Sequence, residues 1–483
     1  MKAIIASAVL LLPLAATPVE SQQRVLSDRV AKAMPTNYQA PDCGLKSGHF
    51  KVSSGGTYLK TAVEADVPEN QARALDSGER VLLEAMKDNK QSDNPAAWYY
   101  LGRIYLQRGD LYGADSALSR AEKMAPACAA DIDLYRRNAW VALIKGGNGF
   151  EEQKNLDSAL ALYRQAGTVY RKSPIPYYQA ASVFNEQKAT DSAAVYFGRA
   201  VEAGANTKDT TEQTIRNRSA FNQAALLLNA QKDAEAAAAF ERYLTWVPND
   251  IEAKRGLAGA YRRQGQTDKA QKLEQEIVAS GGTAAGPGGA PGAGAGSADL
   301  MNVGVGFYND KKYKEAAEAF GKVAEAEPFN RDALFNLTNT YLALQDGPKL
   351  LVSAQRLAAL EPLNENTLKL VGEGFKMSKQ VDSAVKVAEK VLALPTDIQV
   401  NDLTVSGTTA TLTATATGRQ AQTAAGKPIK PAPVALTVEF LDPKGTVVAS
   451  QDVQVPALEA GKTHEVKAAG QGGGIAAWRY KQK

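Results

Sequence analysis

The segment from Asn94 to Pro126 reads NPAAWYYLGRIYLQRGDLYGADSALSRAEKMAP. In its first half the Leu-Gly pair at 101–102 is followed three residues later by Tyr105. In its second half Ala114 is followed four residues later by Leu118. The segment ends at Pro126, and proline cannot continue a helix. This pattern predicts two short helices joined by a turn, with small residues where their axes approach each other.

The same pattern recurs along the chain at a fixed spacing. A small residue followed four positions later by a bulky one recurs at Ala159 and Tyr163, Ala193 and Phe197, Ala236 and Phe240, and Ala316 and Phe320. The step from Phe307 to Tyr341 is 34 residues, and the step from Tyr341 to Phe375 is again 34. The pattern resembles the tetratricopeptide repeat, a helix–turn–helix unit of this length. About eight such units between Asn94 and Pro395 predict a mainly α protein built as an α-solenoid.

The predicted domain organisation has six parts. They are a signal peptide at 1–21, an N-terminal segment with a capping helix at 22–93, a first repeat block at 94–279, a flexible Gly/Ala/Pro linker at 280–297, a second repeat block at 298–395 and a small β-sandwich at 396–483. Within the second part, residues 69–90 predict an isolated capping helix. Residues 37–63 predict a short hairpin that turns at Gly55 and Gly56.

The N-terminus carries the pattern of a secretory signal peptide. An apolar run, AIIASAVLLLPLAA, follows Lys2, and small residues follow the run, which places cleavage after Ala16 or after Ser21. The alternative is a membrane anchor, but the run is shorter than the roughly 20 residues of a spanning helix. We therefore expect export, to the bacterial periplasm or out of the cell. In an oxidising compartment Cys43 and Cys128 either form one disulfide or remain two free thiols.

The last part of the chain changes from helical spacing to strict alternation. TATLTATAT at 409–417 alternates, and β-branched residues dominate the rest of this part. The stretches VEFLDPKGTVV, ALEAGKT and WRY resemble the FxLYD-type immunoglobulin-like modules of exported bacterial proteins. This resemblance implies a small β-sandwich.

The sequence gives little support for an enzymatic function. His49 and His464 lie in different predicted domains, and the sequence has no His-Glu-x-x-His, Cys-x-x-Cys or Gly-x-Ser-x-Gly motif. We predict no catalytic residues, no cofactor and no metal site. An enzyme with an unrecognised carboxylate site remains as an alternative. The formal net charge of +4 is too small to indicate nucleic acid as a partner.

Resemblance to tetratricopeptide arrays implies that a protein or an extended peptide binds along the concave face, which the first helices of the repeats line. Helical spacing predicts the side chains on that face to be Tyr99, Arg103, Leu106, Tyr178, Ser182, Asn185, Arg255, Arg262, Arg263, Phe335 and Asn339. The three predicted arginines between 255 and 263 would suit an acidic partner segment, or else form a solvated helix end. The expected function is that of an exported protein–protein interaction scaffold, and the alternative is a dedicated cell-envelope assembly or secretion factor.

The composition of residues 280–297 generates the first testable prediction. Glycine, alanine and proline cannot bury apolar area there, so limited proteolysis of the mature chain should cut first within this segment and release two helical fragments. The fragments are identified by mass spectrometry. Early cleavage elsewhere, with this segment intact, would contradict the two-block organisation.

Overall fold

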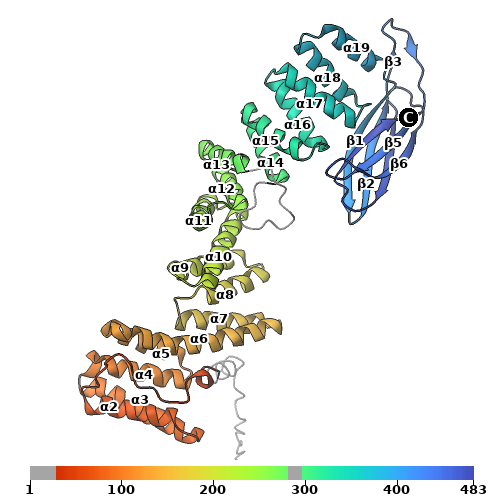
Figure 1. Ribbon diagram of the computed structural model, residues 1–483. Helices are drawn as coiled ribbons and strands as arrows, with labels where there is room; N and C mark the ends of the chain where they lie inside the picture. Colours follow the sequence, from red (N-terminus) through yellow and green to blue (C-terminus); the bar gives the residue numbers. More distant parts are fainter. Residues whose placement is uncertain (1–28, 281–295) are drawn as a thin grey trace, which may run out of the picture. The chain divides into compact units, whose positions relative to one another are not determined.

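The computed structural model describes residues 29–280 and 296–483, in which a helical repeat array is followed by a β region (Figure 1). The chain divides into two compact units between Trp246 and Val247, and each unit is described by itself. Within the described ranges no helix has the length and apolar content needed to cross a membrane. The predicted signal peptide lies outside these ranges.

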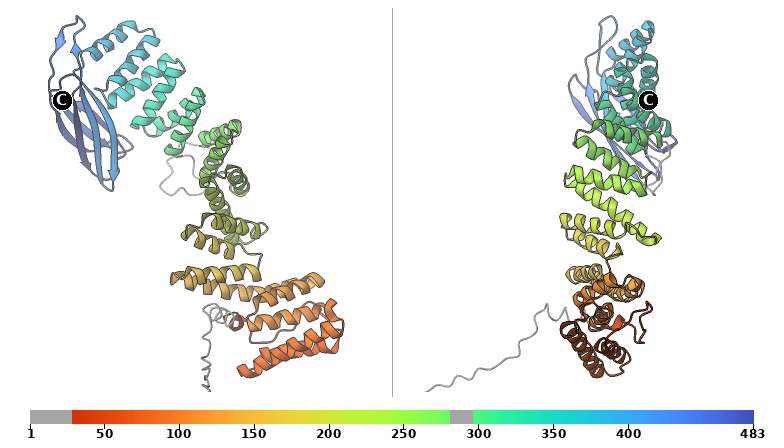
Figure 2. Two further views of the ribbon diagram at one scale, coloured as in Figure 1. Left: turned by 180° about the vertical axis from the view of Figure 1, so that it is seen from behind. Right: turned by 90° about the vertical axis from the view of Figure 1, so that its left-hand side faces the viewer.

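Unit 1 consists of helix pairs that follow one another in chain order, as Figure 2 shows from two further directions. Its helices are α2 (Phe50–Val63), α3 (Pro68–Asp88), α4 (Pro95–Arg108), α5 (Leu111–Met124), α6 (Ala129–Glu152), α7 (Leu156–Val169), α8 (Ile175–Glu186), α9 (Thr190–Ala203), α10 (Thr210–Asn229) and α11 (Asp233–Trp246). Helix α6 has 24 residues, ten more than α4. We call the earlier member of each pair the first helix and the later member the second helix.

In two of the helix pairs a glycine of the first helix lies against a large side chain of the second helix. A methyl group on Gly102 of α4 would lie 2.6 Å from Leu118 Cγ on α5. A methyl group on Gly147 of α6 would lie 2.3 Å from the ring of Tyr163 on α7. Real carbon atoms do not approach so closely, so only glycine allows these helices to pack at this separation.

The turn inside each pair from α4 onward also repeats. One residue there has a positive φ, from 56° at Gln345 to 73° at Gly109, which is the left-handed conformation that often ends a helix. In the described residues these positions are Gly109, Lys154, Lys188, Gln231, Gly265, Lys311, Gln345 and Lys379. They mark eight helix pairs from α4 onward, and the predicted solenoid of about eight repeats is confirmed.

Two expectations for the N-terminal part are wrong. Residues 50–63 form the helix α2 instead of a hairpin, and Gly55 and Gly56 lie inside it. Both glycines are helix-packing positions, because a methyl group on Gly55 would lie 2.5 Å from Leu82 Cδ2 on α3. Helix α3 is therefore not isolated: it pairs with α2 and precedes α4 as one more pair of the array.

Unit 2 contains further helix pairs of the same kind and the β region. Its helices are α12 (Ile251–Arg263), α13 (Thr267–Ser280), α14 (Ser297–Asn309), α15 (Tyr313–Ala326), α16 (Arg331–Ala343), α17 (Gly347–Leu360), α18 (Glu365–Met377) and α19 (Val381–Leu392). The predicted linker lies almost wholly outside the described residues. On either side of it, Ile277 and Val278 of α13 share one apolar core with Leu300 and Val303 of α14. These contacts argue against free reorientation of the two predicted blocks, whose boundaries stay a prediction.

The β region is formed by antiparallel strands in two three-stranded sheets and one short hairpin. The strands are β1 (Thr396–Ser406), β2 (Thr409–Gly418), β3 (Ala421–Gln422), β4 (Pro428–Ile429), β5 (Val434–Leu441), β6 (Val447–Val455), β7 (Thr463–Gln471) and β8 (Ala477–Gln482). The orders are β1-β2-β7, β6-β5-β8 and β3-β4. Alternate residues of both larger sheets, such as Leu412 on β2 and Val438 on β5, fill one shared core.

Buried polar contacts fix this β region on the last repeats. The Tyr480 hydroxyl accepts a hydrogen bond from the Leu363 N–H at 3.2 Å and donates to the Ile398 carbonyl at 3.3 Å. Leu363 also accepts from the Ile398 N–H at 3.0 Å. Arg419 donates to the Val391 carbonyl at 2.7 Å, at the end of α19. Because these groups are buried or half-buried, losing one partner would leave another unsatisfied.

The glycine contacts generate a matched pair of substitutions. Gly102→Ala should lower the free energy of unfolding by about 1–3 kcal/mol, because the added methyl group meets Leu118. Gly149→Ala, inside α6, should raise stability by about 0.5–1 kcal/mol, because nothing lies within 4 Å of its added carbon. Thermal unfolding followed by circular dichroism measures both. Equal shifts in the two variants would show that Gly102 is not a close-packing position.

Candidate peptide-binding face

The side chains predicted to line an open groove on α4 are buried. The exposed fractions of Tyr99, Arg103 and Leu106 are 0%, 3% and 1%. We call these positions and their counterparts on later first helices the first-helix face. The expectation that α4 presents this face to solvent is wrong, because another part of the chain covers it.

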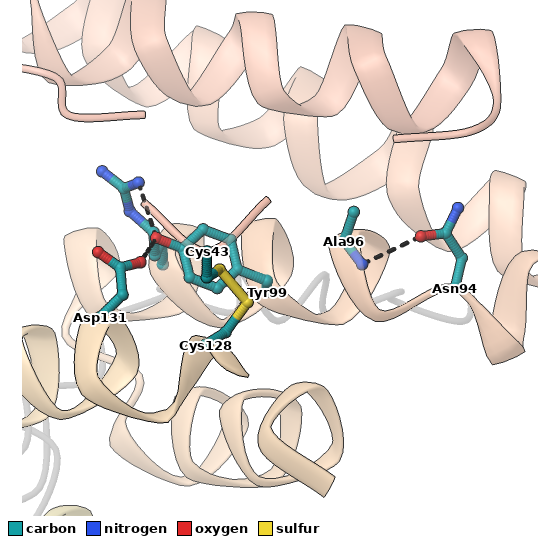
Figure 3. The surroundings of a disulfide bond; sticks show 7 residues. Cys43, Asn94, Ala96, Tyr99, Cys128 and Asp131 are labelled. Carbon is teal, nitrogen blue, oxygen red and sulfur yellow. Dashed lines mark hydrogen bonds between the residues drawn. A yellow bond between two sulfur atoms is a disulfide. The ribbon is translucent and has the colours of Figure 1, made fainter. Parts of the chain in front are cut away.

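The covering element is the N-terminal segment 36–48, which has no regular secondary structure. Arg103 Nη1 donates to the Gln39 carbonyl at 2.8 Å, and Asn94 Nδ2 donates to the Ser47 carbonyl at 2.7 Å. The segment therefore runs antiparallel to α4. Between these two points Cys43 forms a disulfide with Cys128, which lies at the start of α6 (Figure 3). Of the two alternatives for the cysteines, the structure shows the paired one.

The Asn94 side chain, which holds the segment, has a second role. Asn94 is the N-cap of α4, and its Oδ1 accepts from the Ala96 N–H at 3.0 Å (Figure 3). The same amide thus caps the start of α4 and binds the main chain of the segment. This explains why asparagine suits the position, since its side chain carries both an acceptor and a donor.

The buried charge of Arg103 is surrounded by aromatic rings and a carboxylate. Its guanidinium lies 4.1 Å from the ring centre of Tyr135 and 5.1 Å from that of Tyr38. Tyr99 donates a hydrogen bond to Asp131, next to the disulfide in Figure 3, and Arg103 also donates to Tyr99 at 3.2 Å. Burial raises the pKa of the Tyr99 hydroxyl above its ordinary value, so it remains a hydrogen-bond donor. The rings and the Gln39 carbonyl compensate the buried cation directly, and Asp131 does so through its hydrogen bond to Tyr99.

At α8 the first-helix face is more exposed than at α4. Tyr178 and Ser182 are half-buried there and Asn185 is exposed, and binding of a partner at these positions stays a prediction. On α6 the exposed Asn148 follows Gly147 as Arg103 follows Gly102. Its Oδ1 accepts from Tyr163 Oη at 2.8 Å and from the Gln179 amide of α8 at 3.3 Å. This part of the face combines an aromatic ring with several amide and hydroxyl groups.

The predicted basic cluster in unit 2 already has acidic partners. Arg262 is half-buried and forms ion pairs with Glu274 at 2.6 Å and Asp310 at 2.8 Å. Burial would raise the pKa of Asp310, but hydrogen bonds from Gln271 and Arg262 outweigh it and lower that pKa. Arg262 thus joins α13 to the end of α14.

The other predicted members of this cluster lie at the surface. Arg255 is exposed and pairs with Asp299 at 2.5 Å, and Arg263 is also exposed. The interactions of Arg255 and Arg262 are made within unit 2, so these two arginines do not present the free basic patch that the sequence suggested.

The two remaining predicted residues lie together on α16. Both Phe335 and Asn339 are half-buried, and Asn339 Nδ2 donates to the Phe335 carbonyl at 2.9 Å. The Arg331 guanidinium lies 4.6 Å from the centre of the Phe335 ring. Binding of a partner at these positions stays a prediction.

Sequence reasoning missed the residues that cover α4, namely Tyr38, Gln39 and Ser47. It also missed Asn94, which binds Ser47, and Asp131, which accepts from Tyr99. Residues 36–48 have no periodic pattern, so helical spacing carries no information about them. The signal was the cysteine pair, because a disulfide between 43 and 128 requires the segment to reach the start of α6. Within the described part of the chain, no group of three or more His, Cys, Asp or Glu side chains is placed to hold a metal ion.

Comparison with known families supports the repeat assignment. Residues 58–129 match the tetratricopeptide repeat family, so the chain contains tetratricopeptide repeats, and the match includes α3. Proteins with this repeat are typically non-catalytic scaffolds.

Among solved structures, one neighbour is YrrB, described as a TPR protein with an unusual peptide-binding site. It is 18% identical, with 46% of this chain and 98% of that chain covered and a TM-score of 0.31. Another is MamA, from residue 41 to its end, from Desulfovibrio magneticus RS-1. It is 18% identical, with 40% and 96% covered and a TM-score of 0.30. No curated protein matches the chain.

The disulfide generates a prediction about the segment that covers α4. Replacing both Cys43 and Cys128 by serine should lower the free energy of unfolding by about 2–4 kcal/mol, because it frees a loop with a sequence separation of 85 in the unfolded chain. Segment 36–48 should then exchange its amide hydrogens faster, while α8 and α9 stay unchanged. Hydrogen exchange with mass spectrometry measures both regions. Unchanged protection of 36–48 would contradict the covering role of the disulfide.

Proposed function

We propose that the protein is an exported scaffold that binds non-helical segments of partner proteins on its first-helix face, at α8 and the adjoining part of α6. One observation carries this proposal. The chain's own segment 36–48 lies on the same face at α4, held there by side chains of the first helix.

The mode of this internal contact indicates what the open part of the face can bind. Arg103 and Asn94 contact main-chain carbonyls of the segment, which every peptide presents. At α8 the Asn185 amide is exposed, and the Tyr178 ring and the Ser182 hydroxyl are half-buried. The ring packs on one side against Phe197 of α9, and the hydroxyl donates to the Tyr178 carbonyl at 3.0 Å and can still accept a hydrogen bond. Tyrosine often dominates binding energy when an interface buries it, and amide side chains can pair with a peptide backbone. A tyrosine with neighbouring polar groups therefore favours an extended peptide over an apolar ligand.

Export is part of the proposal. The apolar run after Lys2 has the pattern of a secretory signal peptide, and a disulfide suits an oxidising compartment such as the bacterial periplasm. A cell-envelope assembly or secretion factor would use the same face and would differ in having one fixed partner.

The test separates binding from folding. Tyr99 and Arg103 are unsuitable targets, because their replacement removes buried contacts. The informative variant is Tyr178→Ala with Asn185→Ala, measured against peptides selected by display on the mature chain. Fluorescence anisotropy should show affinities at least about tenfold weaker than those of the parent chain.

The matched control changes Val195 and Glu202 to alanine, two exposed positions on the second helix α9. This control should keep the parental affinity and the parental thermal midpoint. If the Tyr178 and Asn185 variant folds and binds every selected peptide as well as the control does, the first-helix face at α8 is not the binding site.

A further inference from the structure

The second helix of a repeat has an outer face that the next first helix covers. On α15, Ala317 and Ala324 on this face are 8% and 1% exposed, under α16. One period later on α17, Leu351 is 8% exposed. A methyl group on Gly374 of α18 would lie 2.8 Å from Leu351 Cα, so α18 approaches α17 closely at this point.

The same positions on α19 are apolar and open. One period after Leu351 lies Val385, with 50% of its surface exposed, and Val381 and Leu392 are exposed at 65% and 42%. Together with the exposed Ala388 they follow one side of the helix at steps of four, three and four residues. No residue of α19 is buried, and α19 lies at the outer end of the row α16 to α19 in Figure 1. The chain then enters β1, so no further first helix covers this face within the described residues.

A repeat array normally ends in a polar outer face, because an exposed stacking face promotes association. The other end of this array is more polar. Along one side of α2 the exposed residues Ser53, Thr57 and Thr61 are polar, and the exposed rings of Phe50 and Tyr58 lie eight residues apart and form no continuous stripe. The apolar end at α19 is therefore a departure that solubility alone does not explain.

We propose that the outer face of α19 is a docking surface for an amphipathic helix of a partner protein that carries arginine or lysine along one edge. The apolar stripe of Val381, Val385, Ala388 and Leu392 would receive the apolar side of that helix. The partner helix would then lie where the first helix of one more repeat would lie.

Charge on one edge of the stripe indicates the basic partner. Asp382 and Glu389 are exposed, seven residues apart and on the same side of α19, and neither forms an ion pair with a described residue. The exposed Lys386 lies between them in sequence but farther round the helix from the apolar stripe, so the two carboxylates are the charges next to the stripe on this edge. The chain already uses this spacing inside unit 1. There Arg136 of the first helix α6 reaches both Asp115 at 3.6 Å and Glu122 at 3.4 Å on α5.

The same charges disfavour a second copy of this chain as the occupant. Two copies of α19 that pack antiparallel about a twofold axis would place their acidic edges on the same side of the contact. Asp382 and Glu389 of each copy would then lie near those of the other, and like charges at that separation repel.

The experiment uses two hydrocarbon-stapled helical peptides as probes, with the full mature chain. Both carry the same apolar stripe, and one has arginines along the edge where the other has glutamates. The arginine peptide should bind the parent chain in fluorescence anisotropy, and the glutamate peptide should bind at least about tenfold more weakly. Val385→Lys should lower the affinity for the arginine peptide at least about tenfold. The double substitution Asp382→Asn with Glu389→Gln should lower this affinity about two- to fivefold.

The control is Val352→Lys, at a position on α17 that is 59% exposed and outside the stripe. This variant should bind the arginine peptide with the affinity of the parent chain. Circular dichroism should show that the α19 variants are folded, because α19 has no buried residue. Failure of the arginine peptide to bind, or equal binding by Val385→Lys, overturns the proposal. Sedimentation should find the parent chain monomeric. A dimer that Val385→Lys dissociates would make a second copy the occupant and overturn the proposed partner.

Discussion

The whole array depends on the contact between a small residue of a first helix and a large side chain of its second helix. Gly102 against Leu118 and Gly304 against Phe320 are two instances, and in each an added methyl group would lie 2.6 Å from the facing side chain. This contact brings the two axes close and uses one face of each helix. The remaining apolar faces must be covered by something else, so a single pair is not stable alone and the pairs stack.

Sequence periodicity predicts this contact well, and it predicts little about what covers the other faces. The repeated pattern of small and bulky residues identifies Gly102, Ala159, Ala193 and Phe320 as packing positions, and these residues are buried or closely packed in the structure. Periodicity also indicates which side chains leave each pair. It could not show that Tyr99 and Arg103 are covered by residues 36–48, because that contact links a non-periodic segment to a periodic one.

The error at Gly55 and Gly56 has a related cause. Two adjacent glycines between short apolar stretches favour a turn, and this pattern is the basis of the predicted hairpin. In the structure the same absence of side chains lets Leu82 reach the backbone of α2 at Gly55. Local sequence does not distinguish a glycine needed for a turn from one needed for close helix packing. The distinction depends on α3, a helix that lies later in the sequence and supplies the packing partner.

The segments outside the repeats act on the faces that the repeats leave open. Residues 36–48 cover the first-helix face at α4 and are held by a disulfide and by hydrogen bonds to main-chain carbonyls. The β region shares its core with Leu363 and Leu368, and Tyr480 aligns it through hydrogen bonds to two main-chain groups. In both places polar contacts fix the register and apolar burial supplies the larger area. The outer face of α19 has the apolar part of such a contact and an unpaired acidic edge, which makes it complementary to a helix that no described residue of this chain supplies.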